Sequence, residues 1–193
     1  MMLGIVYITY TASKIVQKHT LVVYMILGIM SDSHDNLEAI LAALNIFRHE
    51  NVEMLVHLGD IISPFAFMRI VELPARIIAL LGNNDGDILS LREIALKAGA
   101  MIKQNIYSLS IENRRILLIH GFGTAEQTKE IVESIASSGR YDAILYGHTH
   151  RSNVYSINGT LILNPGEVCG YLTGRRSIAI LDTLTMEYRV VEF

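Results

Sequence analysis

DAILYGHTH, residues 142–150, begins as an apolar run and ends in a glycine and two histidines. The run has the length of a buried strand, and residues two apart on a strand share one face. We therefore expect His148 and His150 to point the same way, with Thr149 turned away. Two imidazoles on one face suit a metal ion, but the pattern also occurs at ordinary strand ends, so its meaning depends on other ligands.

The chain around this stretch alternates apolar strands with amphipathic helices, which indicates an α/β fold. At 193 residues, half of them hydrophobic, one compact domain with a sizeable core is expected. The pattern predicts strands at 25–30, 54–58, 76–81, 107–111, 115–119, 142–150, 153–157, 160–163, 177–181 and 186–191. It predicts helices at 37–50, 68–72, 87–98 and 124–138.

Residues 1–24 differ from the rest of the chain. Two apolar stretches, 1–12 and 21–30, are separated by polar residues, so neither reaches the roughly 18 apolar residues of a membrane span. The first charges follow the first apolar stretch instead of preceding it, which is unlike a signal peptide. Our hypothesis is that the natural start is Met25, that residues 1–24 are an upstream extension, and that 25–193 form the domain.

Composition excludes several classes of protein. The formal net charge of −3 gives no basic excess, which argues against a protein that binds nucleic acid through phosphate contacts. Cys169 is the only cysteine, so the chain has no internal disulfide framework and fits a reducing cytoplasm. A small buried apolar role is predicted for it. No membrane partner is indicated, and a homo-oligomer stays open.

Polar side chains follow the predicted strands at the point where each strand ends. They stand within two residues of the end of each apolar run, at Asp32, Asp60, Asn83, His120 and His148. Open α/β sheets gather ligands at the carboxyl ends of their strands. Each fragment is common by itself, because Gly-Asp is an ordinary turn. Together, in this order, they predict one shared site.

The residue types predict two divalent metal ions. Oxygen and nitrogen donors without a thiolate suit such ions, and a carboxylate can bridge two of them. We assign one ion to Asp32, His34, Asp60 and His150, and the other to Asp60, Asn83, His120 and His148. Two ions about 3.5–4 Å apart can hold a hydroxide between them and clamp a phosphoryl group during in-line displacement.

The ordered set resembles the calcineurin-like metallophosphoesterase superfamily. It consists of DSH at 32–34, GD at 59–60, GNND at 82–85, HG at 120–121 and GHTH at 147–150. Short length and the segments NPGE (164–167) and CGYLTG (169–174) are most similar to the small prokaryotic YfcE-like phosphodiesterases. The resemblance implies a four-layer α/β/β/α sandwich with two mixed sheets, and hydrolysis of small phosphodiesters supported by Mn²⁺ or Ni²⁺. The strand pattern alone also permits a single doubly wound sheet.

One position departs from the superfamily. Asn84 stands where many members have a histidine beside the metals, which is thought to protonate the leaving group. An amide cannot act as a general acid near neutral pH. The expected catalytic residues are then Asp60, Asn84 and His120, and substrates with good leaving groups, such as aryl phosphodiesters, should be favoured. His57, inside a predicted strand, is interpreted as a packed or supporting residue.

Other functions stay open. A non-catalytic metal-binding scaffold on the same fold, like the retromer subunit that resembles this family, would not need every ligand. A nuclease or phosphomonoesterase of the same superfamily is a second alternative, and the absence of basic arms or a cap disfavours the nuclease. A serine hydrolase using Ser31 or Ser33 with His34 is more remote, because the chain has no Gly-x-Ser-x-Gly motif.

Overall fold

The computed structural model describes residues 14–17, 20–23 and 25–193. Strands β1 (Lys14–Gln17) and β2 (Thr20–Val23) pair antiparallel in a two-stranded sheet of their own. The rest of the predicted extension, residues 1–13, 18–19 and 24, lies outside the described residues. The predicted domain boundary at Met25 therefore stays a prediction.

A six-stranded mixed sheet contains most of the first half of the chain. Its order is β13-β12-β3-β4-β5-β6. Strands β3 to β6 run parallel, and β12 pairs antiparallel with β3 on one side and with the edge strand β13 on the other. The bounds are β3 (Ile26–Met30), β4 (Met54–His57), β5 (Arg76–Leu80), β6 (Met101–Lys103), β12 (Ser177–Asp182) and β13 (Tyr188–Glu192).

A five-stranded mixed sheet contains the next five strands along the chain, β7 to β11, in the order β10-β11-β9-β8-β7. The three inner strands β11, β9 and β8 are parallel, and each outer strand forms a hairpin with its neighbour. The bounds are β7 (Ile106–Ile111), β8 (Arg114–Ile119), β9 (Ala143–Tyr146), β10 (Asn153–Ile157) and β11 (Thr160–Asn164).

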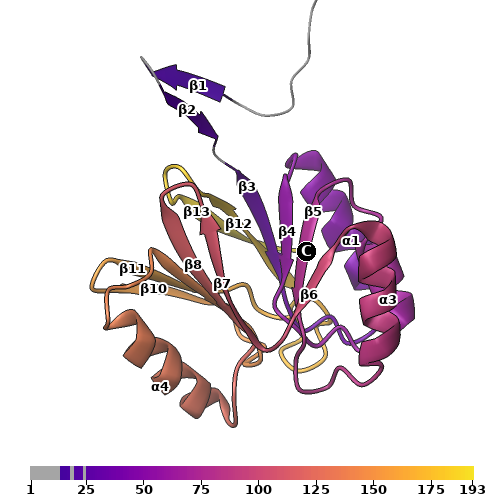
Figure 1. The fold of residues 1–193 in the computed structure, drawn as a ribbon. Coiled ribbons are helices and arrows are strands. Elements are labelled where there is room, and N and C mark those ends of the chain that lie inside the picture. Colours follow the sequence, from indigo (N-terminus) through magenta and orange to yellow (C-terminus); the bar gives the residue numbers. More distant parts are fainter. Residues whose placement is uncertain (1–13, 18–19, 24) are drawn as a thin grey trace, which may run out of the picture.

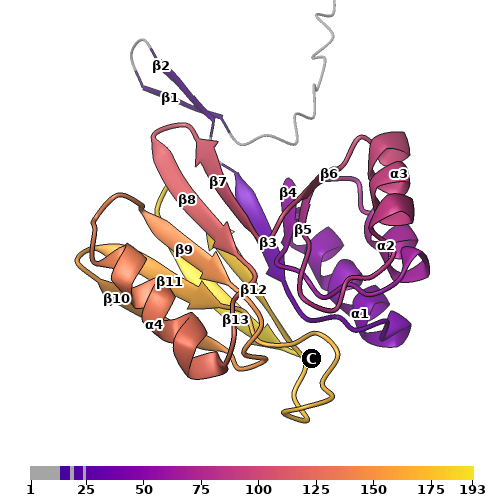
Figure 2. The same cartoon turned by 60° about the horizontal axis from the view of Figure 1, so that its bottom comes forward.

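Helices cover the outer faces of both sheets (Figures 1 and 2). Helices α1 (Leu37–His49), α2 (Pro64–Ile70) and α3 (Ile88–Ala98) lie on the six-stranded sheet, and α4 (Ala125–Ala136) lies on the five-stranded sheet. The four-layer α/β/β/α sandwich that the resemblance implied is confirmed, and the single doubly wound sheet is excluded. Among the described residues, no helix is both long enough and apolar enough to cross a membrane.

Three apolar clusters fill the spaces between the four layers. One packs α1 to α3 on the six-stranded sheet, one lies between the sheets, and one packs α4 on the five-stranded sheet. Strand β3 contributes side chains to two of these clusters, one on each face. Leu27 and Ile29 point to the other sheet, and Met30 points to the helices. Gly28 makes room for α1, because a Cβ there would come within 2.8 Å of the Phe47 ring.

The structure differs from the predicted elements in three places. It contains a strand, β6, that the sequence does not predict, because MIK carries no clear apolar pattern and is partly exposed. Helix α2 begins at Pro64, earlier than expected, with Ser63 as its N-cap. Strand β9 ends at Tyr146, so GHTH is a loop and the argument from one strand face is wrong. The chain turns there, since His148 and His150 have left-handed φ of 66° and 61° and Thr149 N donates to Gly147 O at 2.7 Å.

Candidate metal centre

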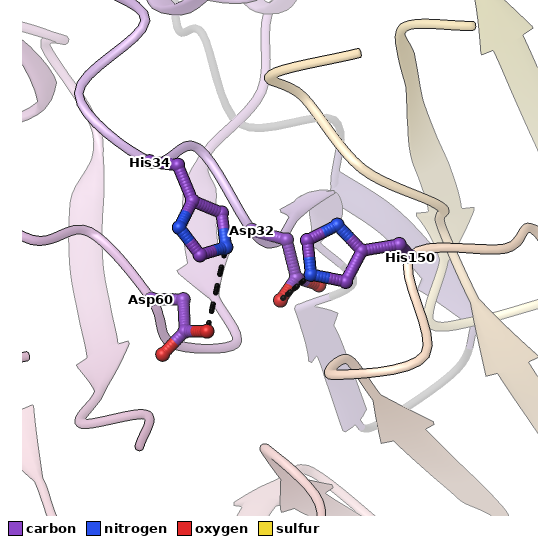
Figure 3. Close-up of side chains that lie close together, drawn as sticks. All are labelled: Asp32, His34, Asp60 and His150. Atoms are coloured by element: carbon purple, nitrogen blue, oxygen red, sulfur yellow. Dashed lines mark ion pairs between the residues drawn. The ribbon is translucent and has the colours of Figure 1, made fainter. Parts of the chain in front are cut away.

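Loops at the carboxyl ends of β3, β4 and β9 bring four predicted ligands together (Figure 3). Asp32, His34, Asp60 and His150 each offer one ligand atom, and these atoms lie within 4.8 Å of one another. His34 Nε2 is 3.4 Å from Asp60 Oδ2, and His150 Nε2 is 3.6 Å from Asp32 Oδ1. The four residues come from three separate segments of the chain, and His150 is distant in sequence from the other three, so the group exists only in the folded chain.

The loops present these side chains from unusual backbone conformations. The left-handed region, which non-glycine residues seldom adopt, contains Asp32, His34, Asp60, His148 and His150, with φ between 39° and 66°. Backbone hydrogen bonds hold the strained turns, because Asp32 N donates to Gly59 O and both Ser33 N and His34 N donate to Asp60 O. Strain of this kind persists only where the surroundings fix it, and it concentrates at functional sites.

Glycines allow the loops to approach each other. A Cβ on Gly59 would lie 2.6 Å from the His120 ring, and a Cβ on Gly121 would lie 2.5 Å from His148 Cβ. Both glycines also have positive φ, at 107° and 144°. The glycines of the GD and HG motifs are therefore required by packing against the histidines as well as by the turn.

Two buried polar atoms of this group, Asp32 Oδ1 and His34 Nε2, have no hydrogen-bond partner among the described residues. Asp32 is fully buried, and this burial raises the pKa of its carboxyl group, although His120 and His150 oppose the effect. Its other oxygen accepts from His148 N at 3.1 Å. Since buried polar atoms are normally paired, the unpaired carboxylate oxygen and imidazole nitrogen fit a shared cation.

Asp60 lies between the two predicted ligand sets. Its carboxylate is 1% exposed and accepts from Asn84, Oδ1 from the backbone N at 2.9 Å and Oδ2 from Nδ2 at 2.7 Å. Oδ1 is also 3.5 Å from His120 Nε2. Burial by itself raises the pKa of Asp60, but His120 and the Asn84 hydrogen bonds outweigh it and hold the pKa below its usual value. The lowered pKa favours the ionised form of Asp60, which its predicted role as a ligand of both ions would require.

The second predicted set is brought together only in part. His120 Nδ1 donates to Leu58 O at 2.8 Å, so Nε2 carries the lone pair and faces Asn83 Oδ1 at 2.9 Å. Two acceptors this close to each other suit a cation that both contact. His148 packs edge-on against His120 at 5.2 Å between ring centroids, and its Nε2 donates to Gly123 O. Within the described chain, His148 forms no compact group with Asp60 and His120.

Three supporting residues were given no role by the sequence. Asp85 accepts four backbone N–H groups of the loops around Asp60. Asn164 Nδ2 donates to Gly147 O and to Thr149 Oγ1, both at 3.0 Å, and so holds the GHTH loop. Glu167 accepts from His150 Nδ1 at 2.7 Å. The available signal was that Asn164 directly follows the predicted strand 160–163, as the predicted ligands follow theirs.

His57 is fully buried below the site, as interpreted from the sequence. Its Nδ1 accepts from Gly59 N at 3.2 Å, so Nε2 carries the proton and donates to Ser33 Oγ at 3.0 Å. Burial, reinforced by His120, lowers the pKa of His57 to about 3. The neutral ring joins two loops and offers no free lone pair to a metal.

Cys169 is buried, as predicted, and its thiol donates to Glu167 Oε2. Burial raises the pKa of the thiol to about 12, and the Glu167 carboxylate adds to the effect. A thiol held in this protonated form is a poor nucleophile.

Comparisons with known proteins agree with this geometry. A family model described as "Calcineurin-like phosphoesterase superfamily domain" matches residues 25–186. The chain is 40% identical over 168 residues to Phosphodiesterase MJ0936 of Methanocaldococcus jannaschii, covering 86% of this chain and 98% of that protein.

Solved structures share the fold. One described as a novel archaeal phosphodiesterase aligns with a TM-score of 0.80 and 40% identity, over 88% of this chain and all of that chain. The phosphoesterase YfcE of E. coli aligns with a TM-score of 0.63 and 23% identity, over 86% and 98% of the two chains. The second likeness is one of fold alone.

Proposed function

The chain belongs to the calcineurin-like phosphoesterase superfamily, and from that premise we propose that this phosphoester hydrolase is a metal-dependent phosphodiesterase acting on small phosphodiesters. The observation that carries the proposal is the compact group of Asp32, His34, Asp60 and His150, with two buried atoms that lack partners in the described chain. The phosphodiesterase relative that is 40% identical supports the class of substrate.

Two divalent ions fit the ligand set, with Mn²⁺ or Ni²⁺ as our proposal for their identity. Asp32, His34 and His150 would hold one ion, Asn83, His120 and His148 the other, and Asp60 would contact both. Bound there, the ions would lower the pKa of the attacking water and offset the negative charge that builds on the phosphoryl oxygens. Attack in line with the leaving oxygen needs no protein nucleophile, which agrees with the protonated Cys169 thiol.

The protein's own groups set the protonation states around the reaction. The Leu58 carbonyl fixes the proton of His120 on Nδ1, so Nε2 faces the site. Asn84 donates its amide N–H to Asp60 and holds that carboxylate in place. Because an amide supplies no proton at neutral pH, the leaving group has to depart without help from this position.

The test uses metal-stripped protein supplied separately with Mn²⁺, Ni²⁺, Mg²⁺ or Zn²⁺. Initial rates would be measured on phosphodiesters, phosphomonoesters and nucleotides. We expect diester hydrolysis only with added metal, and a loss of at least about 100-fold in Asp60→Asn, because that change weakens the ligand shared by both ions. Glu93→Gln is the matched control, since this exposed carboxylate pairs only with Lys97 in the described chain.

The outcomes separate the competing functions. Full activity without metal would overturn the proposal. Bound metal without turnover of any substrate would support a scaffold, and activity confined to monoesters would support a phosphomonoesterase.

A further inference from the structure

Glu167 is a buried carboxylate that lies next to the proposed metal site. It follows β11 after the turn at Pro165 and Gly166, and it is 0% exposed. The backbone on its carboxyl side is tied to the first ligand loop, because Val168 N donates to Ser31 O at 3.0 Å and Cys169 N donates to Asp32 O at 3.1 Å. A fully buried carboxylate requires several donors, and the fold supplies them.

The two oxygens of Glu167 serve different parts of the structure. Oε1 accepts from Leu172 N at 3.0 Å, from Thr173 N at 2.6 Å and from Thr173 Oγ1 at 2.7 Å, and so closes the loop after β11. Oε2 accepts from His150 Nδ1 at 2.7 Å, from the Cys169 thiol at 3.0 Å and from Leu172 N at 3.2 Å. Oε1 therefore holds the loop alone, whereas Oε2 holds both the loop and a proposed metal ligand.

The hydrogen bond to Oε2 determines which nitrogen of His150 is free. A carboxylate only accepts, so the neutral imidazole must carry its proton on Nδ1. Nε2 then has the lone pair, and this nitrogen is the one that faces Asp32 Oδ1 at 3.6 Å. The ring orientation is also fixed by stacking on His34, at 5.1 Å between centroids and 26° between planes.

We infer that Glu167 is a positioning residue that fixes the tautomer and orientation of His150 for metal binding. The inference rests on the proposed role of His150 as a ligand. A carboxylate that accepts from the second nitrogen of a metal-bound histidine orients the ring and raises its basicity, and losing it typically weakens metal binding 10- to 100-fold.

The competing explanation is that Glu167 only stabilises the loop. Two variants separate the explanations. In Glu167→Gln we expect the amide oxygen at the Oε1 position, because the Leu172 and Thr173 backbone N–H groups that point there cannot turn away, so the NH₂ group faces His150 Nδ1. Nδ1 must then accept, which moves the proton to Nε2 and blocks the metal-binding lone pair. Thr173→Val removes the loop hydrogen bonds of the Thr173 hydroxyl, to Glu167 Oε1 and with Arg175 O and N, and leaves Oε2 and His150 untouched.

The experiment measures the tautomer of His150 and the affinity for Mn²⁺. Long-range ¹H–¹⁵N spectra of ¹⁵N-histidine-labelled, metal-stripped full chain at about pH 8 report the tautomer of each neutral ring. Loss of a signal in His150→Gln assigns it among the seven histidines. Calorimetry with Mn²⁺ then gives the apparent affinity. Neither readout requires hydrolysis, so a failure here differs from a failure of the proposed phosphodiesterase activity.

We expect the unmodified protein to show the proton on His150 Nδ1. Glu167→Gln should move it to Nε2 and weaken Mn²⁺ binding about 10- to 100-fold. Thr173→Val should keep the tautomer and bind Mn²⁺ within about threefold of the unmodified protein, because the carboxylate remains. A proton on Nε2 in the unmodified protein would overturn the inference even if no variant folds. Equal weakening in both variants, or unchanged Mn²⁺ affinity in Glu167→Gln, would also overturn it.

Discussion

Asp85 holds the loop that presents Asp60. Its Oδ2 accepts from Asp60 N and Gly82 N, and its Oδ1 accepts from Ile61 N and Ile62 N, at 2.7–3.0 Å. Ile62 has φ of 85°, which is rare for a β-branched residue, and Asp60 has φ of 58°. The four hydrogen bonds stabilise this strained turn, so the position of the shared ligand depends on both oxygens of Asp85.

Replacing Asp85 with Asn should therefore damage both stability and the site. One acceptor oxygen remains, and the new NH₂ group faces backbone N–H groups. We expect the free energy of unfolding to fall by about 1–3 kcal/mol and metal-supported activity to fall about 10- to 100-fold. Urea unfolding and initial rates measure the two effects. Asp87→Asn is the control, since Asp87 caps α3 and Asn caps as well. Unchanged rates in Asp85→Asn would contradict the supporting role.

The presence of Asn84 predicts how the hydrolysis rate depends on the leaving group. Without a general acid at this position, rates on aryl phosphodiesters should fall steeply as the pKa of the leaving group rises. Asn84→His should flatten this dependence and raise the rate on poor leaving groups. Asn84→Ala, which also loses the hydrogen bond to Asp60 Oδ2, should slow all substrates and keep the slope. A flat dependence in the unmodified protein would refute the prediction.

At the scale of single residues, the sequence identified candidate ligands but not their supports. The candidates share a visible pattern, a polar group directly after an apolar strand. Asp85 acts on backbone N–H groups whose direction depends on left-handed turns, and no residue pattern reveals that. Glu167 follows β11, and only the parallel pairing of β11 with β9 shows that this strand ends at the site.

Arg114 links the two sheets at the edge opposite the site. From the start of β8 its guanidinium donates to Asp142 Oδ1 at 3.0 Å, to Thr183 O at 3.3 Å and to Leu184 O at 3.0 Å. The last two carbonyls follow β12 of the other sheet. Asp142 Oδ2 also accepts from Arg115 N at 2.8 Å. Burial raises the pKa of Asp142, but the hydrogen bonds from Arg115 and Arg114 outweigh it and hold the pKa below its usual value.

A lowered pKa in the folded state implies a defined pH dependence. The ionised Asp142 stabilises the fold above its unfolded pKa of about 4, and this contribution is lost as pH falls through the folded value. Asp142→Asn should lower the free energy of unfolding at pH 7 by a few tenths to about 1 kcal/mol, since the pair is partly exposed. Urea unfolding should show a smaller difference in the free energy of unfolding between Asp142→Asn and the unmodified protein at about pH 3 than at pH 7. Glu187→Gln is the surface control, and an equal difference at both pH values would contradict the prediction.

At the scale of elements, the sequence located most strands but not their sheets. β4 and β9 are both four residues long and fully buried, and they lie in different sheets. An apolar run indicates that a strand is buried on both faces. It does not distinguish a face covered by helices from a face covered by a second sheet. The sandwich could therefore be predicted from the resemblance to the superfamily, and not from the pattern of apolar residues.

For the whole molecule, the start of the domain is the remaining prediction. Met25 belongs to the folded body, because its N donates to Thr183 Oγ1 at 3.0 Å, its O accepts from Thr183 N, and its side chain packs between the sheets. Every strand of the two large sheets follows it, and the family match begins there. We propose that residues 25–193 suffice for folding and activity.

A chain shortened to begin at Met25 should keep the free energy of unfolding within about 0.5 kcal/mol and hydrolyse phosphodiesters at the same rate, because the contacts of both large sheets remain. The contrasting chain begins at Ser31 and lacks β3, the strand that pairs with both β12 and β4. This chain should fail to fold. Loss of β3 separates the two halves of the six-stranded sheet and removes Leu27 and Ile29 from the core between the sheets. Urea unfolding and hydrolysis rates compare the three chains. Aggregation or loss of activity in the chain from Met25 would show that residues 1–24 belong to the domain.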